Sequence, residues 1–201
     1  MRVFAISDMH GRLEGLDPKE ADLVVVAGDF GIMYGWGERD LNDQVVWTNT
    51  KLREWCASYP KTQFRFVPGN HDISKPTPEF FSFYQRHYGK DRFCFRHNGC
   101  AFIGINSTLI HGGESEGENK QYAWLEKELK KARKCRMRMV FSHIPLVNTS
   151  MDEKEEYFNY PKSMRTKYMD LFKKYNVCAL MCGHLHKNAL VESDGIEILT
   201  T

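Results

Sequence analysis

The sequence predicts an α/β domain from three observations. Apolar runs rich in β-branched residues, such as the Leu-Val-Val-Val-Ala stretch at 23–27, are typical of strands buried on both faces of a sheet. Segments with apolar residues at helical spacing alternate with these runs along the chain. Most of the runs end at a glycine or a polar residue, where a strand would leave its sheet. With 201 residues and no linker-like segment, the chain is most simply one domain, residues 1–201.

Strands are expected wherever a short apolar run is bounded by polar or turn residues. Their ranges are 3–6, 23–27, 64–67, 93–96, 100–105, 137–141 and 177–181, followed by a closing hairpin that includes Val191 and 196–198. Asn98-Gly99 and Asp194-Gly195 are strong turn signals, so each predicts a hairpin between the strands that flank it.

Helices are expected at 41–57, 121–133 and 164–174, where apolar residues recur at helical spacing. A further helix begins after Thr77, which suits an N-cap, with Pro78 in its first turn. The segments 30–40, 106–119 and 147–162 lack such a pattern and are expected to be loops. Glu114, Glu116 and Glu118 would then serve the solubility of the middle loop.

The composition excludes some classes of partner. Apolar residues make up 42% of the chain, charged residues 27%, and the formal net charge is +2, which favours neither a nucleic acid nor a membrane surface. The first apolar run is too short for a secretory signal, and no stretch is long enough to span a membrane. The six cysteines lack C-x-x-C spacing. We therefore expect a cytoplasmic protein with reduced thiols.

The stretch Gly69-Asn70-His71-Asp72 has the composition of a functional turn. It follows an apolar run at 64–67 and a Pro68-Gly69 pair, so it lies where a buried strand leaves its sheet. Gly69 allows a sharp turn and a close approach to a ligand. An amide, an imidazole and a carboxylate follow at once. Taken alone, this tetrapeptide is better explained as an Asx-type turn with an incidental histidine. The residues at the other strand ends favour a functional site instead.

Five expected strands each end in a residue that can bind a metal ion. In chain order these residues are Asp8 with His10, Asp29, Asn70, His143, and His184 with His186. Ligands gather at the carboxyl ends of strands in α/β sheets. Seven ligands are too many for one tetrahedral ion, but they suit two ions about 3.5–4 Å apart that share a carboxylate, as in displacement at phosphorus. Mixed nitrogen and oxygen ligands favour manganese, iron or zinc over magnesium or calcium.

These residues resemble the five sequence blocks of the calcineurin-like metallophosphoesterases. The blocks are Asp8-x-His10, Gly28-Asp29, Gly69-Asn70-His71-Asp72, His143-x-Pro145 and Gly183-His184-x-His186, in the family order and across nearly the whole chain. The resemblance implies a two-sheet β-sandwich flanked by helices. It also implies a dinuclear metal-dependent phosphoesterase, with two divalent or trivalent ions drawn from manganese, iron and zinc.

The resemblance implies a role for each of these residues. One ion would be held by Asp8, His10, Asp29 and His186, and the other by Asp29, Asn70, His143 and His184, with Asp29 bridging. His71 would act on the leaving-group oxygen, while Asp72 would support the turn. We expect a hydroxide held between the ions to attack phosphorus in line, with inversion and without a phosphoenzyme.

Within the family, the segments 141–146 and 157–165 look like those of small Ser/Thr-phosphatase-type members. Gly28-Asp29 is followed by Phe30-Gly31-Ile32 instead of the Asp-Arg-Gly of the large protein phosphatases, which weakens the case for a protein substrate. We expect a phosphomonoester, either a small molecule or a phosphoprotein. The alternatives are a phosphodiesterase acting on cyclic nucleotides or related diesters, and a non-catalytic scaffold that binds a partner protein.

Several other residues have two interpretations. Tyr34 and Trp36, which follow Asp29 closely, suit a wall that stacks on substrate as well as they suit packing. His111 could approach substrate, although a surface role is the simpler interpretation. The basic run from Lys130 to Arg138 is better explained as a solvated helix end than as a phosphate track.

Overall fold

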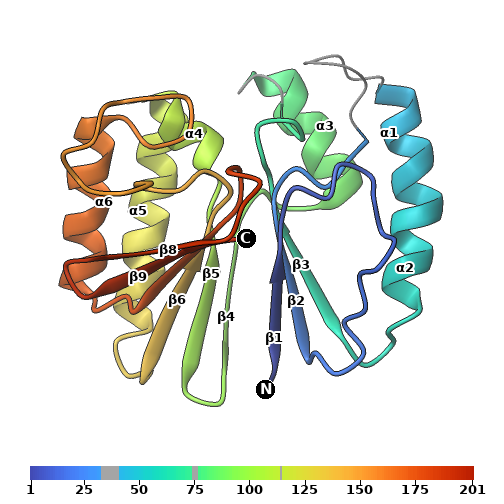
Figure 1. Ribbon diagram of the computed structural model, residues 1–201, viewed down its shortest axis with the longest axis horizontal. Helices are drawn as coiled ribbons and strands as arrows, with labels where there is room; N and C mark the ends of the chain where they lie inside the picture. The colour runs from blue at the N-terminus through green and yellow to red at the C-terminus, as the bar shows by residue number, and fades with distance from the viewer. Residues whose placement is uncertain (33–40, 74–76, 114) are drawn as a thin grey trace.

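Two β-sheets pack face to face at the centre of the molecule, and helices cover the outer face of each. The computed structural model describes residues 1–32, 41–73, 77–113 and 115–201. In Figure 1 the helices α1, α2 and α3 lie beside the smaller sheet, and α4, α5 and α6 lie beside the larger one. The expected α/β class and the two-sheet sandwich flanked by helices are confirmed.

The smaller sheet contains three parallel strands in the order β1-β2-β3. They span Val3–Ile6, Leu23–Ala27 and Gln63–Val67. The middle strand, β2, is buried at every position because both of its faces are covered. Since the three strands run in the same direction, the residues that follow them gather at one end of the sheet.

The larger sheet has six strands in the order β4-β5-β6-β7-β9-β8. They span Phe93–His97, Cys100–Gly104, Met137–Phe141, Ala179–Cys182, Ile196–Thr200 and Ala189–Ser193, in that spatial order. The strands β5, β6, β7 and β9 are parallel, and the edge strands β4 and β8 are antiparallel to their neighbours. Both expected hairpins are present, with Asn98 and Asp194 at positive φ in their turns.

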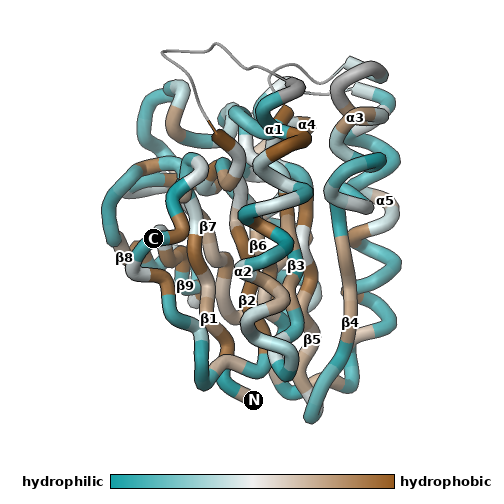
Figure 2. The backbone as a smooth tube through the Cα atoms, turned by 90° about the vertical axis from the view of Figure 1, so that its right-hand side faces the viewer, coloured by the Kyte–Doolittle hydropathy of each residue, from teal (hydrophilic) through white to brown (hydrophobic). Residues whose placement is uncertain are grey.

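The core has three layers because successive side chains of a strand point to opposite faces. Leu23 and Val25 of β2 pack between the sheets against Phe102 and Phe141. Val24 and Val26 face the other way, toward the layer under α1–α3. A third and larger cluster fills the space between the six-stranded sheet and helices α5 and α6. Figure 2 shows hydrophobic residues concentrated in the strands, while α2 and α5 outside them are coloured mostly as hydrophilic.

The helices agree with the expected ranges in part. The segment 41–57 consists of α1 (Leu41–Trp47), a π-helical turn (Thr48–Leu52) and α2 (Arg53–Ala57). Helix α3 (Pro78–Tyr88) begins after Thr77 as expected, although the Thr77 side chain makes no capping hydrogen bond. Helix α6 spans Lys162–Lys174.

The prediction that residues 106–119 form a loop is wrong. This segment contains the short helix α4 (Ser107–His111) and the first turn of α5 (Glu116–Lys131). Ser115 caps α5 by accepting a hydrogen bond from the backbone N–H of Glu118 at 3.1 Å. Glu118 is fully buried, where its carboxylate accepts hydrogen bonds from Tyr168 Oη (2.9 Å) and Lys167 Nζ (2.7 Å), so its expected role in loop solubility is also wrong.

The basic run from Lys130 to Arg138 begins at the end of α5, as expected, but it continues into β6 and is not wholly solvated. Arg138 is buried, and its guanidinium donates hydrogen bonds to the carbonyl oxygens of Ala132, Cys135 and Asn176. It therefore satisfies backbone acceptors that the end of α5 leaves open. The six cysteines are all free thiols, as expected. Among the described residues no helix is both long enough and apolar enough to cross a lipid bilayer.

Candidate metal centre

The structure brings all seven expected ligand residues together at the carboxyl ends of the strands of both sheets. Asp8, Asp29 and Asn70 follow β1, β2 and β3 of the smaller sheet. His143 follows β6, and His184 follows β7, in the larger sheet. The side chains form two groups, each of which contains three metal-ligating atoms within 4.8 Å of one another.

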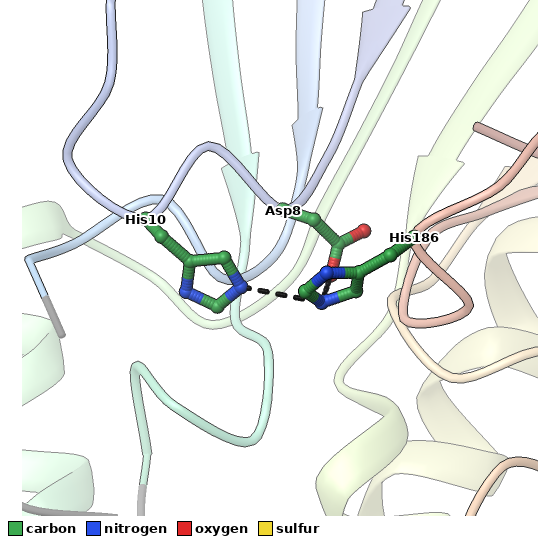
Figure 3. A group of neighbouring side chains, drawn as sticks. All are labelled: Asp8, His10 and His186. Atoms are coloured by element: carbon green, nitrogen blue, oxygen red, sulfur yellow. Dashed lines mark hydrogen bonds and ion pairs between the residues drawn. The ribbon is translucent and has the colours of Figure 1, made fainter. Parts of the chain in front are cut away.

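The first group consists of Asp8, His10 and His186 (Figure 3). Nε2 of His186 lies 3.3 Å from Oδ1 of Asp8 and 3.4 Å from Nε2 of His10. The other carboxylate oxygen of Asp8, Oδ2, accepts hydrogen bonds from the backbone N–H of His184 (2.8 Å) and from Ser7 Oγ (2.5 Å). These bonds hold the carboxylate so that Oδ1 faces the two imidazoles.

The second group consists of Asp29, His143 and His184, and all three are buried. Nε2 of His143 lies 3.0 Å from Oδ2 of Asp29, 3.2 Å from Nδ1 of His184 and 3.1 Å from Oδ1 of Asn70. Nδ1 of His143 lies 2.8 Å from the carbonyl oxygen of Ala27. Because a carbonyl oxygen can only accept, Nδ1 carries the hydrogen, and Nε2 is directed at the group.

The pKa values of the second group reflect its burial and its charges. Burial by itself lowers the pKa of His143, but the carboxylate of Asp29 outweighs it and raises that pKa to about 9. Burial and the neighbouring His143 lower the pKa of His184 to about 4. Burial raises the pKa of Asp29, yet His143 and His71 hold it well below its usual range. Beside Asp29 the imidazole of His143 therefore favours its protonated form, whereas that of His184 favours its neutral form.

The carboxylates of Asp8 and Asp29 are buried and face imidazole nitrogens at ion-pair distance. Oδ2 of Asp29 lies 3.0 Å from Nε2 of His143, Oδ1 of Asp8 lies 3.3 Å from Nε2 of His186, and neither oxygen has another hydrogen-bond donor among the described residues. Buried carboxylates are costly unless a cation lies beside them, so these positions fit metal ions. Asp29 also acts electrostatically on His10 in the first group, as it does on His143 in the second.

Five of the seven residues have a left-handed backbone conformation. The φ angles of Asp8, His10, Asp29, His184 and His186 lie between 46° and 73°. Asp, Asn and His enter this region more readily than most residues, but each such residue still costs on the order of 1 kcal/mol or more. In the described part of the chain only Asn98, Asn176 and Asp194 are other non-glycine residues at positive φ. Strained backbone is therefore concentrated at this centre.

Two glycines permit the close approach of the strand ends. A Cβ atom on Gly28 would lie 2.6 Å from the ring of His143. A Cβ atom on Gly69 would lie 2.5 Å from the backbone nitrogen of Asp29 and nearer still to its carboxylate. Neither position can hold a side chain without displacing a residue of the second group.

His71 and Asp72 take different places in the turn after β3. The His71 imidazole is partly exposed, and its Nε2 lies 3.9 Å from Oδ2 of Asp29, at the edge of the centre. Asp72 is buried, and its carboxylate accepts hydrogen bonds from the backbone N–H groups of Asp29, Gly69, Phe30 and Gly31. It joins the turns after β2 and β3, and through the backbone of Asp29 it supports the second group.

The expected substrate-lining residues have different outcomes. Tyr34 and Trp36 lie outside the described residues. His111, at the end of α4, makes an edge contact with Tyr157, with ring centroids 6.1 Å apart. Tyr157 itself was not expected at the site, yet its ring lies 4.8 Å from that of His184, centroid to centroid. It belongs to the segment between β6 and α6, which has no periodic pattern that could have placed it.

The sequence of residues 1–188 matches the family described as calcineurin-like phosphoesterase. The chain belongs to this family. The bovine (Bos taurus) serine/threonine-protein phosphatase CPPED1 is 40% identical over 128 residues, which cover 61% of this chain and 41% of the relative. The chain thus spans less than half the length of this curated relative.

Two further comparisons extend over more of the chain. A probable glycerophosphodiester phosphodiesterase, GpdQ, from Arcobacter nitrofigilis is 26% identical over 194 residues, which cover 94% of this chain and 64% of the relative. A crystal structure of a dimetal phosphatase from Danio rerio superposes with a TM-score of 0.66 at 13% identity, covering 98% of this chain and 86% of that one. This likeness shows the shared fold. The resemblance found in the sequence is confirmed.

Proposed function

We propose that this chain is a metal-dependent phosphoesterase that hydrolyses a phosphomonoester. The observation that carries the proposal is the pair of ligand groups, in which buried carboxylate oxygens of Asp8 and Asp29 converge with imidazole nitrogens of His186 and His143 at 3.3 Å and 3.0 Å. A scaffold that had lost catalysis would have no need to keep these ligand atoms together. Membership in the calcineurin-like phosphoesterase family and the likeness to CPPED1 support the same function.

The donor set accommodates two ions. Asp8, His10 and His186 would hold one and Asn70, His143 and His184 the other, with Asp29 shared between them. Imidazole and carboxylate ligands together favour manganese, iron or zinc. Bound ions of this kind supply Lewis acidity toward phosphoryl oxygens and a hydroxide nucleophile near neutral pH.

The protein's own residues complete the reaction. His71, partly exposed at the edge of the centre, is placed to donate a hydrogen bond or a proton to the leaving-group oxygen. Asp72 fixes the turn that carries His71 by accepting four backbone hydrogen bonds. His111 and Tyr157 lie beside the second group, where they would contact the substrate.

The substrate class follows from the relatives and from the charge of the chain. The likeness to the serine/threonine-protein phosphatase CPPED1 supports a phosphorylated substrate, and we propose that it is a small molecule or a phosphoprotein. The similarity to GpdQ, which extends over 94% of this chain, favours a phosphodiester as the second candidate. A nucleic acid is not expected because the net charge is only +2. The free cysteines are consistent with a cytoplasmic site of action.

Hydrolysis of p-nitrophenyl phosphate and of bis-p-nitrophenyl phosphate, each with added Mn²⁺, tests the proposal. We expect turnover that requires the metal, is faster on the monoester and is abolished in Asp29→Asn. Faster turnover of the diester would select the second candidate. Protein that binds Mn²⁺ but turns over neither ester, under conditions where a commercial phosphatase does, would contradict both.

A further inference from the structure

Tyr157 contacts two residues of the second ligand group through two different atoms. Its hydroxyl oxygen lies 2.6 Å from Nδ2 of Asn70, and its carbonyl oxygen lies 3.1 Å from Nε2 of His184. The ring packs against the imidazole of His184. Asn70 and His184 come from different sheets, so one residue of the segment between β6 and α6 links the ligands contributed by both.

The hydroxyl contact holds the Asn70 amide at its donor end. A side-chain amide has a donor end and an acceptor end, and only the oxygen can bind a metal ion. Nδ2 donates its hydrogen to the oxygen of Tyr157, and Oδ1 lies 3.1 Å from Nε2 of His143, on the side of the second group. The two contacts together keep the oxygen directed at that group. Without the hydroxyl, the donor end of the amide would lose this partner.

The carbonyl contact decides which nitrogen of His184 can bind. A carbonyl oxygen only accepts, so Nε2 of His184 carries the ring hydrogen. Nδ1 of the neutral ring then has the lone pair, and it faces Nε2 of His143 at 3.2 Å. An acceptor on the far nitrogen of a ligand imidazole fixes both its tautomer and its orientation.

The segment that carries Tyr157 is anchored by a buried cation. Arg165 of α6 is fully buried, and its guanidinium donates to the carbonyl oxygens of Met151, Glu153, Lys154 and Tyr160. These acceptors lie on both sides of Tyr157 in the sequence. The backbone at 157 is thus held firmly enough for its side chain and carbonyl to act as fixed partners.

We propose that Tyr157 is a positioning residue that sets the binding atoms of Asn70 and His184 for the second metal ion. This inference rests on the proposed function, because it assumes that the second group binds an ion. Among the described side chains, Asp8, His10 and His186 of the first group make no hydrogen bond or ring contact with Tyr157, so the affinity of that group should not depend on Tyr157.

Calorimetric titration with Mn²⁺ tests the inference without reference to activity. In the wild-type protein we expect two ions per chain. Tyr157→Phe removes the hydroxyl and keeps the carbonyl contact with His184. We expect the affinity of one of the two sites, the one formed by the second group, to fall about 10- to 100-fold, the usual loss when a residue that hydrogen-bonds to a metal ligand is changed. The affinity of the other site should be unchanged. The matched control is Phe158→Leu, which removes a neighbouring ring that lies 5.5 Å from His184 without a hydrogen bond to Asn70.

A double-mutant cycle with Asn70→Ala separates positioning from a merely structural role. If Tyr157 acts through the Asn70 amide, Tyr157→Phe should cost no further affinity once that amide is gone. Equal affinities for Tyr157→Phe and the wild type would overturn the inference while leaving the proposed function intact. So would an equal loss in Phe158→Leu, or an undiminished loss in the Asn70→Ala background. Wild-type protein that takes up no Mn²⁺ would overturn the proposed function itself and this inference with it.

Discussion

Asp72 holds Asp29 through its backbone: Oδ2 of Asp72 accepts a hydrogen bond from the N–H of Asp29 at 2.7 Å. The same oxygen accepts from the N–H of Gly69 at 2.9 Å, and the other oxygen accepts from two residues that follow Asp29. One buried carboxylate therefore joins the turn that presents Asp29 to the turn that presents Asn70 and His71. The geometry of the second ligand group therefore depends on a residue outside the two ligand groups.

Asp72→Asn should lower the free energy of unfolding. The new amide nitrogen would face backbone N–H groups that need an acceptor. The N–H groups that bond to that position would therefore lose their acceptor. Hydrogen bonds to a charged group contribute about 1.5–3 kcal/mol each, and we expect a loss of about 3 kcal/mol in urea unfolding. Asp17→Asn, at an exposed position, should change the value by less than about 0.5 kcal/mol. Equal free energies of unfolding for the two variants would refute this role of Asp72.

Gly69→Ala should disturb the centre by steric overlap alone. The added methyl group would lie 2.5 Å from the backbone nitrogen of Asp29 and nearer to its carboxylate. We expect a loss of about 1–3 kcal/mol in stability, typical of overpacking, together with weaker Mn²⁺ binding. At Gly112 the nearest atoms to an added Cβ lie at 3.6 Å, so Gly112→Ala is the control and should bind Mn²⁺ normally. Normal binding by Gly69→Ala would show that Asp29 can move freely.

His71→Ala should lower kcat without changing the number of bound ions. General acid catalysis by a positioned group contributes about 100- to 10,000-fold. The loss should be largest for an alkyl phosphate, whose leaving alkoxide needs a proton, and smallest for p-nitrophenyl phosphate, whose leaving group is stable as an anion. Steady-state rates on the two substrates, with metal content measured in parallel, check this. The same loss on both substrates would exclude a role for His71 at the leaving group.

Arg165→Met should loosen the segment that carries Tyr157. The substitution keeps much of the apolar volume but leaves the carbonyl oxygens of Met151, Glu153, Lys154 and Tyr160 without their shared donor. Unsatisfied buried acceptors cost about 1–3 kcal/mol each, so we expect at least about 3 kcal/mol of destabilisation. Hydrogen exchange in 151–160 should accelerate as well. Arg53→Met, on the exposed surface of α2, is the control and should leave both measurements unchanged.

Much of the fold could be predicted because its signals are local. The run at 23–27 is entirely apolar, and β2 is buried at each position. The turns at Asn98-Gly99 and Asp194-Gly195 need positive φ, which those residue pairs accept. The ligand residues could be found for a related reason: each follows a strand directly, and parallel strands bring their ends together.

The missed features depend on contacts between distant segments. Glu118 is buried because Lys167 and Tyr168, some 50 residues later, neutralise and bind its carboxylate. Tyr157 reaches Asn70 across 87 positions of sequence. The start of α5 is different, since Ser115 followed three residues later by Glu118 is a capping signal that the surrounding glycines obscured.

Anomalous diffraction from crystals soaked in Mn²⁺ shows whether the two ligand groups bind metal ions. We expect two strong peaks per chain, about 3.5–4 Å apart as in two-metal sites. One should be bound by Asp8, His10 and His186, the other by Asn70, His143 and His184, with the carboxylate of Asp29 between them. Anomalous density confined to other parts of the surface, or no ordered metal at either group, would show that the proposed dinuclear centre is wrong.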